Sequence, residues 1–247
     1  MKTFGKMLKL EGRLSVRDMN MLIFAELMPL VILILIGIIY GKKEAFPGAD
    51  YTFLEQSFGG LCSIAICARG FMGLPLVISE YREKKILKKF QVTPVSPLML
   101  LLVHITIYAI YGAVSVLSLW IVAKIFWGFG IKGSLGIFLL GWLLVLVPML
   151  SIGMMVGGIA KNSKSASIIA SVLYFPMLVF SGATLPYEVM PGAMQKIVNV
   201  LPLTQGIKIL KAGVLGLPLE KVSVSILIMI AITVVCGGCA VKWFRWE

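Results

Sequence analysis

Acidic residues are scarce in this sequence. Only 11 of its 247 residues are aspartate or glutamate, against 23 lysines and arginines, and charged residues together make up 14% of the chain. Hydrophobic residues make up 59%, and the mean hydropathy is +0.99, which is far more apolar than a soluble domain of this length requires. The composition predicts an integral membrane protein, a single domain over residues 1–247 that leaves no room for a separate soluble domain.

Motifs for nucleotide or metal chemistry are also missing. No Gly-x-x-x-x-Gly-Lys-[Ser/Thr] occurs, so we expect the chain to bind no ATP by that route and to be no enzyme itself. The single histidine, His104, has no second ligand near it in the sequence, so we expect no metal site there. Cys236-Gly-Gly-Cys239 lies within an apolar stretch, where cysteine packs as a small hydrophobe. We therefore expect no cofactor and no metal on this chain.

The net charge of +12 raises the question of a nucleic-acid partner. The basic residues flank apolar stretches and do not form a basic domain, so anionic lipid headgroups and membrane topology account for them better. We expect membrane lipids as partners and no nucleic acid.

Six apolar stretches are long enough to cross a bilayer, for which about 20 residues suffice. They predict an all-α fold with spans at about 21–41, 57–79, 98–124, 135–160, 165–185 and 222–242. The fourth contains Gly153-x-x-x-Gly157, a small-residue face that permits close helix packing. More lysines and arginines fall on the side of the two termini than on the other side, so the positive-inside rule predicts both termini in the cytoplasm.

Two segments outside the spans are apolar on one side. Residues 1–20 place basic residues on one stripe of a helix and apolar residues on the opposite face, interrupted by Glu11. This pattern predicts an amphipathic helix lying on an anionic leaflet. Residues 186–221 are too apolar for a free loop and predict extracellular re-entrant helices between the fifth and sixth spans.

The segment 80–97 is the one long, highly charged stretch with a span on each side. On a helix over 80–92, Ile86, Leu87 and Phe90 share one face, the basic residues spread over the other, and Pro94 and Pro97 end the helix. An ordinary basic loop that only orients the protein would explain the lysines, but not the apolar face or the proline stop. We expect a short cytoplasmic helix that a soluble partner can bind.

Glu26 and Arg69 are charges within predicted spans. An isolated charge near the bilayer centre is unfavourable by a few kcal/mol, so such residues usually find a partner or water. The two residues could form an intramembrane charge pair; alternatively, Arg69 reaches the interface or braces the bundle. Proton coupling would need a chain of titratable groups, and the sequence offers none.

Two motifs resemble a known family. The stretch from Arg82 to Ser96, Arg-Glu-Lys-Lys-Ile-Leu-Lys-Lys-Phe-Gln-Val-Thr-Pro-Val-Ser, is similar to the cytoplasmic motif of type-2 ABC export permeases. The stretch from Phe175 to Pro186, with Met190-Pro191 and Leu201-Pro-Leu-Thr204, resembles that family's second motif. Lys85-Ile86 stands where Gly-Thr is common. The Arg-Glu and Thr-Pro pattern fits the drug-export branch better than the glycan-export branch.

The resemblance implies a role for named residues. The first motif corresponds to the coupling helix that docks on a separate cytoplasmic ATPase, with candidate coupling residues Arg82, Glu83, Ile86, Leu87, Phe90, Thr93, Pro94 and Ser96. The second corresponds to the outer gate, where re-entrant helices close the exit, with candidate residues Pro176, Ser181, Gly182, Pro186, Met190, Pro191 and Pro202.

The resemblance implies the membrane subunit of an ATP-driven exporter in a bacterial or archaeal cell membrane, moving a drug, peptide antibiotic or lipid-like amphiphile. ATP and Mg²⁺ would bind to the partner ATPase, and a second permease would complete a homodimer or heterodimer. One alternative is an exporter of a lipid-linked glycan or teichoic-acid precursor, which should show a line of exposed aromatics that the sequence lacks. Another is a self-contained secondary transporter, which the scarcity of intramembrane carboxylates disfavours.

Overall fold

The structure is a computed structural model that describes residues 2–15, 23–86, 97–181 and 191–242. Within these ranges the chain forms helices and no strand, and an isolated bridge joins Glu44 to Thr52. Six helices among the described residues are long and apolar enough to cross a membrane: Ile23–Tyr40, Phe53–Glu83, Met99–Trp127, Leu135–Ile159, Ser163–Phe180 and Glu220–Ala240. The predicted all-α membrane fold with six spans is therefore confirmed.

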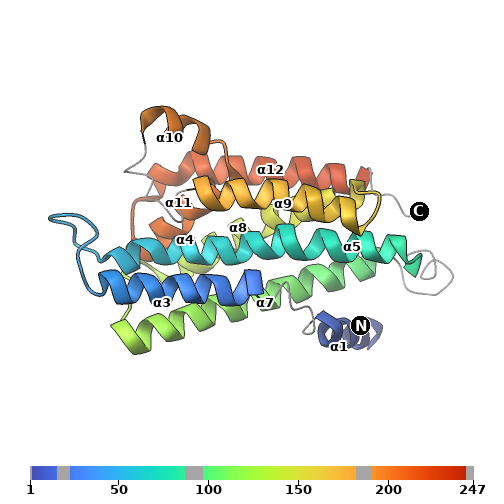
Figure 1. The fold of residues 1–247 in the computed structure, drawn as a ribbon, viewed down its shortest axis with the longest axis horizontal. Helices are drawn as coiled ribbons and strands as arrows, with labels where there is room; N and C mark the ends of the chain where they lie inside the picture. Colours follow the sequence, from blue (N-terminus) through green and yellow to red (C-terminus); the bar gives the residue numbers. More distant parts are fainter. Residues whose placement is uncertain (1, 16–22, 87–96, 182–190, 243–247) are drawn as a thin grey trace.

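The spans run up and down as one elongated bundle (Figure 1). In chain order they comprise η1 (Ile23–Leu27) with α3 (Met28–Tyr40), α4 (Phe53–Ala68) with η2 (Arg69–Gly73) and α5 (Leu74–Glu83), α7 (Pro97–Trp127), α8 (Leu135–Ile159), α9 (Ser163–Phe180), and η4 (Leu219–Val222) with α12 (Ser223–Lys242). We call the end where α5 and α8 end and α9 begins the coupling end, and the other the distal end.

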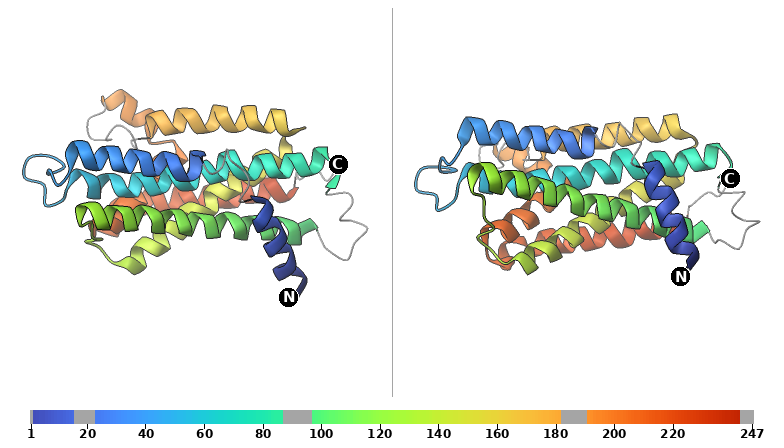
Figure 2. Two further views of the ribbon diagram at one scale, coloured as in Figure 1. Left: turned by 60° about the horizontal axis from the view of Figure 1, so that its bottom comes forward. Right: turned by 90° about the horizontal axis from the view of Figure 1, so that it is seen from below.

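Three further helices among the described residues are not membrane spans. Helix α1 (Lys2–Ser15) lies across the coupling end and packs against α7 (Figure 2). Helices α10 (Gly192–Val198) and α11 (Pro202–Leu215) lie at the distal end, and α11 packs against α4 and α8. The segment between the fifth and sixth spans is thus helical where the structure describes it, and α11 is largely buried.

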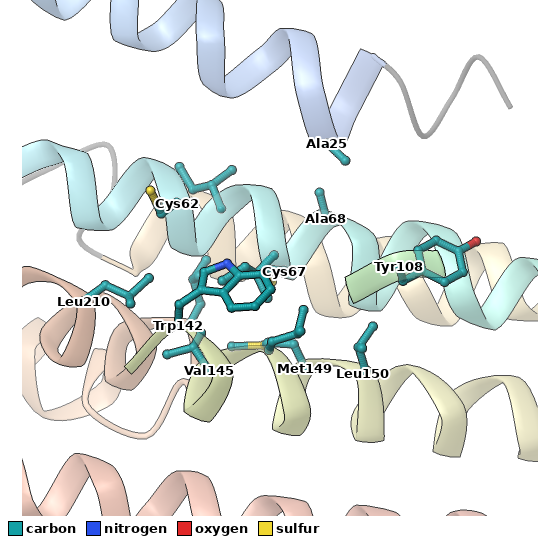
Figure 3. Packing of buried hydrophobic residues seen from close by; sticks show 14 of the residues in the cluster. Ala25, Cys62, Cys67, Ala68, Tyr108, Trp142, Val145, Met149, Leu150 and Leu210 are labelled. Atoms are coloured by element: carbon teal, nitrogen blue, oxygen red, sulfur yellow. The ribbon is translucent and has the colours of Figure 1, made fainter. Parts of the chain in front are cut away.

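The helix from Phe53 to Glu83 is the core of the bundle. In its most apolar stretch 83% of the residues are buried, against 17% for Glu220–Ala240. The helix begins at Phe53, earlier than predicted, because Thr52 and Glu55 form a capping box: the Glu55 amide donates to Thr52 Oγ1 at 3.2 Å, and the Thr52 amide donates to Glu55 Oε2 at 2.7 Å. Side chains of α4 meet those of α8 across the core (Figure 3).

Small residues let the backbone of α8 come into direct contact with the backbone of this central helix. A Cβ atom added at Gly153 would lie 2.0 Å from the carbonyl oxygen of Gly70, and one added at Gly157 would lie 3.0 Å from Pro75 Cα. No side chain fits in the first gap. The glycine pair predicted from sequence to allow close packing is therefore where α8 contacts η2 and α5.

Both intramembrane charges lie on short π-helical turns. Glu26 belongs to η1, which is followed by Pro29, and Arg69 belongs to η2, which is followed by Pro75. A proline has no N–H and its ring crowds the carbonyl four residues earlier, so the helix ladder opens just before it. π-Helical turns are frequent at functional sites. Here each π-helical turn contains one of the two charged residues and locally interrupts the regular α-helical hydrogen bonding.

Candidate functional site

The chain turns at Lys84 and Lys85 as it leaves α5. Helix α5 ends at Glu83, and Lys85 has a φ of 55°, a left-handed conformation that favours glycine. The prediction of one continuous helix over 80–92 is therefore wrong at its start, since residues 80–83 continue the second span. Lys85 stands where the similar family commonly has glycine. Because its φ is positive, a right-handed helix cannot continue through this position.

Arg82, a predicted coupling residue, is buried against the end of α8. Its Nη1 donates to the carbonyl of Ala160 at 2.5 Å, and its Nη2 donates to the carbonyl of Gly158 at 3.0 Å. The last carbonyls of a helix have no partner within the helix and carry partial negative charge. The guanidinium satisfies two carbonyls there at once, in a contact that spans more than 70 residues of sequence.

Glu83, the next residue, caps the start of α9. Its Oε2 accepts from the Ser163 amide at 3.0 Å and from Ser163 Oγ at 2.8 Å. The first amides of a helix lack internal partners, and the carboxylate complements their partial positive charge. Arg82 and Glu83 therefore hold the two sides of the short α8–α9 connection.

The rest of the predicted coupling segment is only partly described. Ile86 is half-buried, whereas Leu87, Phe90, Thr93, Pro94 and Ser96 lie outside the described residues. Lys84 points to solvent and pairs with Glu80 at 2.5 Å, and this hydrogen bond raises the pKa of Lys84. The apolar face proposed for Ile86, Leu87 and Phe90 stays a prediction.

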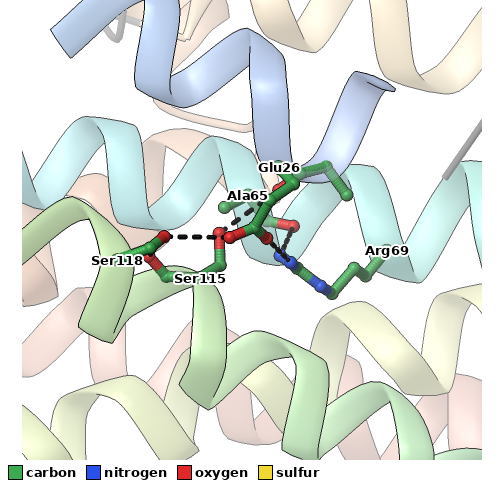
Figure 4. Close-up of polar contacts among 6 residues, drawn as sticks. Glu26, Ala65, Arg69, Ser115 and Ser118 are labelled. Carbon is green, nitrogen blue, oxygen red and sulfur yellow. Dashed lines mark hydrogen bonds and ion pairs between the residues drawn. The ribbon is translucent and has the colours of Figure 1, made fainter. Parts of the chain in front are cut away.

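The structure brings Glu26 and Arg69 into contact. Arg69 Nη2 donates to Glu26 Oε2 at 2.6 Å and Arg69 Nη1 donates to the Ala65 carbonyl at 2.9 Å, while Ser118 Oγ donates to Glu26 Oε1 at 2.9 Å (Figure 4). The Arg69 side chain is only 2% exposed and that of Glu26 26%. Of the two possibilities left open by the sequence, the geometry is that of a charge pair joining the first span to the second and third.

The predicted outer-gate residues lie at or near the distal end where the structure describes them. Pro176 lies within α9, Ser181 caps that helix, Pro191 precedes α10 and Pro202 begins α11. Gly182, Pro186 and Met190 lie outside the described residues. Ser181 is buried, and its Oγ has no hydrogen-bond partner among the residues described.

Helix α11 carries polar residues into this region. Lys208 Nζ donates to Asn199 Oδ1 at 2.5 Å, and burial lowers the pKa of Lys208. Gln205 Nε2 donates to the Asn199 carbonyl. These bonds tie α11 to the end of α10, so the two short helices form one hydrogen-bonded unit.

Sequence reasoning missed Glu11. The residue interrupts the apolar stripe of α1, and the structure buries it, with Tyr81 Oη donating to Glu11 Oε2 at 2.5 Å. An acidic residue within an apolar stripe was the available signal. In the described part of the chain no three His, Cys, Asp or Glu residues lie close enough together to hold a metal ion.

The arrangement is that of a multi-pass membrane protein with a charged segment at one end and buried short helices at the other. The sequence model of the ABC-2 type transporter family matches residues 4–215. The match covers most of the chain, so the chain belongs to the ABC-2 type transporter family.

Individual relatives cover less of the chain. It is 29% identical over 160 residues to the inner membrane transport permease YhhJ of Escherichia coli (strain K12), which is 63% of this chain and 42% of that protein, and the match to YhhJ of Shigella flexneri is the same. It is 33% identical over 76 residues to nodulation protein J of Rhizobium meliloti (strain 1021), covering 31% of this chain and 29% of that protein. The chain thus spans less than half the length of these relatives.

Proposed function

We propose that this chain is the membrane subunit of an ATP-driven exporter that moves a small amphiphile, such as a drug, a peptide antibiotic or a lipid-like molecule, out of the cell. The family match carries the proposal. A separate ABC ATPase would bind ATP and Mg²⁺, because the sequence has no phosphate-binding loop of its own. The segment that leaves α5 beside the α8–α9 connection is the docking site for this ATPase.

The proposal also includes the orientation of the chain in the membrane and its partners there. The excess of lysine and arginine at the coupling end supports a cytoplasmic location for that end and for both termini, in a bacterial or archaeal cell membrane. Only 22% of the most apolar stretch of Ile23–Tyr40 and 17% of that of Glu220–Ala240 are buried. Such exposed apolar faces suit lipid and a second permease subunit, which we propose completes the transporter.

Docking through an apolar anchor predicts a large effect of one substitution. The Phe90→Asp substitution is expected to abolish co-purification of the ATPase with the chain from its native membrane, because buried apolar anchors dominate such interfaces. The measurement is the amount of ATPase recovered per permease. Phe46→Asp is the matched control, since Phe46 is 49% exposed in the loop at the distal end. Recovery of the ATPase at full strength with Phe90→Asp would refute docking at this segment.

We also propose that the region from Ser181 to Gln205 is a gate that closes the exit path. Non-helical backbone at membrane depth is tolerated only where protein or a water-filled cavity covers it. Ser181 is buried, and hydrogen bonds join α11 to the end of α10. Both observations favour a folded cap and not a free loop.

Thiol labelling tests the gate. In a background without the native cysteines, Ser181→Cys (1% exposed) should react slowly with a membrane-impermeant maleimide added outside the cell, and its rate should change when the ATPase is trapped with ATP. Ile197→Cys on α10 (71% exposed) is the control and should react rapidly in both states. Rapid labelling of both, unchanged by trapping, would rule the gate out.

A further inference from the structure

A buried carboxylate lies where α1 meets two membrane spans. Glu11 of α1 is 5% exposed, and Tyr81 Oη, near the end of α5, donates to its Oε2 at 2.5 Å. His104 of α7 is 4% exposed, and its Nε2 lies 3.8 Å from the same oxygen of Glu11. The rings of Tyr81 and His104 meet edge to face, with their centroids 5.3 Å apart. Three helices therefore contribute a titratable side chain to one small site at the coupling end.

The positive charges of the neighbouring helices do not balance this carboxylate. In the part of the chain that the structure describes, Glu11 forms no ion pair with a lysine or an arginine. The remaining charged and titratable groups of the three helices near the site are directed elsewhere: Lys6, Lys9 and Arg13 of α1 are exposed, Glu80 pairs with Lys84 in solvent, Arg82 bonds the carbonyls at the end of α8, and Tyr111 Oη donates to the Gly12 carbonyl.

Burial favours a neutral form of this site. A carboxylate removed from water with one hydroxyl donor carries a negative charge that its surroundings compensate poorly. One proton bound by Glu11 and His104 together makes the pair neutral, whether the proton resides on the carboxyl group or on the imidazole. Two groups that interact this closely titrate as a pair, so the proton belongs to the site and not to either residue.

The imidazole has a ring nitrogen available for this proton. His104 Nε2 is buried and makes no hydrogen bond to any residue described. A charge-assisted N–H···O bond is about 2.8 Å long, so a movement of about 1 Å would join Nε2 to Glu11 Oε2. Histidine is also the side chain that ordinarily changes charge between about pH 5 and 8.

We propose that Glu11 and His104 form a binding site for one proton, which is taken up from water and held between Glu11 Oε2 and His104 Nε2. With the proton bound, the carboxyl group of Glu11 is joined to both α5 and α7. Without it, Tyr81 alone bonds the carboxylate among the residues described, while the bond from Tyr111 to the Gly12 carbonyl holds α1 in both states. The site thereby makes the firmness with which α1 is attached depend on the pH at the coupling end. The proposal requires neither an ATPase nor a transported substrate.

Nitrogen-15 NMR tests proton binding directly. His104 is the one histidine of the sequence, so the full chain labelled with ¹⁵N-histidine and purified without a polyhistidine tag reports on this ring alone. The ring-nitrogen shifts of the detergent-solubilised protein are followed as a function of pH. Glu11→Gln, which removes the negative charge but keeps the shape, should lower the midpoint of the titration by about 1 pH unit or more. Glu80→Gln is the matched control and should leave the midpoint unchanged, because the Glu80 side chain is 45% exposed and pairs with Lys84.

The mobility of a spin label tests the attachment of α1. A label at Lys9→Cys, on the exposed side of α1, is placed in a background without the native cysteines. Its mobility should decrease as the pH falls through the midpoint found by NMR, and should not follow the pH in Glu11→Gln or His104→Gln. A label at Lys164→Cys, exposed on α9, is the control and should be insensitive to pH.

The possible outcomes decide the inference. An equal midpoint in Glu11→Gln and the unaltered chain, or a His104 spectrum that stays constant over the whole pH range in which the chain is folded, would overturn it. A label on α1 whose mobility ignores the titration, or follows it equally in His104→Gln, would overturn the link to α1. If Glu11→Gln does not fold, Glu11→Asp takes its place, since it withdraws the carboxylate by one methylene and should also lower the midpoint.

Discussion

The Arg69→Met substitution is expected to lower the free energy of unfolding by about 3–5 kcal/mol, the range for breaking a buried ion pair by removing one partner. Methionine keeps much of the side-chain volume but leaves the carboxylate of Glu26 without its cationic partner. The hydrogen bond from Ser118 remains, and it alone does not neutralise the charge. Unfolding of the detergent-solubilised protein in sodium dodecyl sulfate measures the change.

A double-mutant cycle separates pairing from simple loss of packing. Glu26→Gln combined with Arg69→Met should destabilise the protein by less than the sum of the single changes, with a coupling energy of about 1–3 kcal/mol. The solvent-exposed pair of Glu80 and Lys84 provides the control cycle, in which no measurable coupling is expected. Strict additivity for Glu26 and Arg69 would show that the two charges contribute independently.

The Gly153→Leu substitution is expected to disrupt the packing of the bundle core. Even a Cβ at this position would lie 2.0 Å from the Gly70 carbonyl oxygen, and the helix that carries Gly70 is 83% buried in its most apolar stretch, which leaves its backbone little room to move. Overpacking a well-packed core typically destabilises by about 1–3 kcal/mol, and a leucine forced between two helix backbones should reach or exceed the upper value. The expected result is loss of folded protein on size-exclusion chromatography.

A graded series distinguishes steric contact from a general intolerance of larger residues. Gly153→Ala should already be destabilising, whereas Gly237→Ala on α12 should be neutral or slightly stabilising, because no atom lies within 4 Å of its added Cβ. A folded, fully stable Gly153→Leu protein would mean that α8 does not approach the central helix at this point.

Local sequence patterns predicted much of the fold. Hydropathy located the six spans, because a run of apolar residues long enough to cross a bilayer needs no knowledge of its neighbours. The small-residue pair at Gly153 and Gly157 was likewise visible, although its partner, the backbone at Gly70, was not. A pattern along one helix indicates a face for packing and says nothing about which helix fills it.

The polar contacts at the coupling end escaped prediction for the same reason. Arg82 was identified through a resemblance, but its hydrogen bonds to the carbonyls of Gly158 and Ala160 join residues 76 and 78 positions apart. The spacing of residues along one helix cannot reveal such contacts. Glu11 interrupts the apolar stripe of α1, and the Tyr81 hydroxyl that compensates part of the cost of burying its carboxylate lies 70 residues away in the sequence. The turn at Lys85 was hidden because lysine is a good helix former and rarely adopts a positive φ.

Glu26 and Arg69 lie on adjacent spans joined by the short connection at 41–52, and the acidic residue comes first along the chain. Proteins are synthesised from the N-terminus, so the span with the carboxylate is made before the span with the arginine. An arginine at the centre of a span opposes insertion by about 2.5–3.5 kcal/mol on its own. If the two spans insert together as a helical hairpin, the paired charges form a neutral unit, and this neutrality would offset part of the free-energy cost of inserting the arginine.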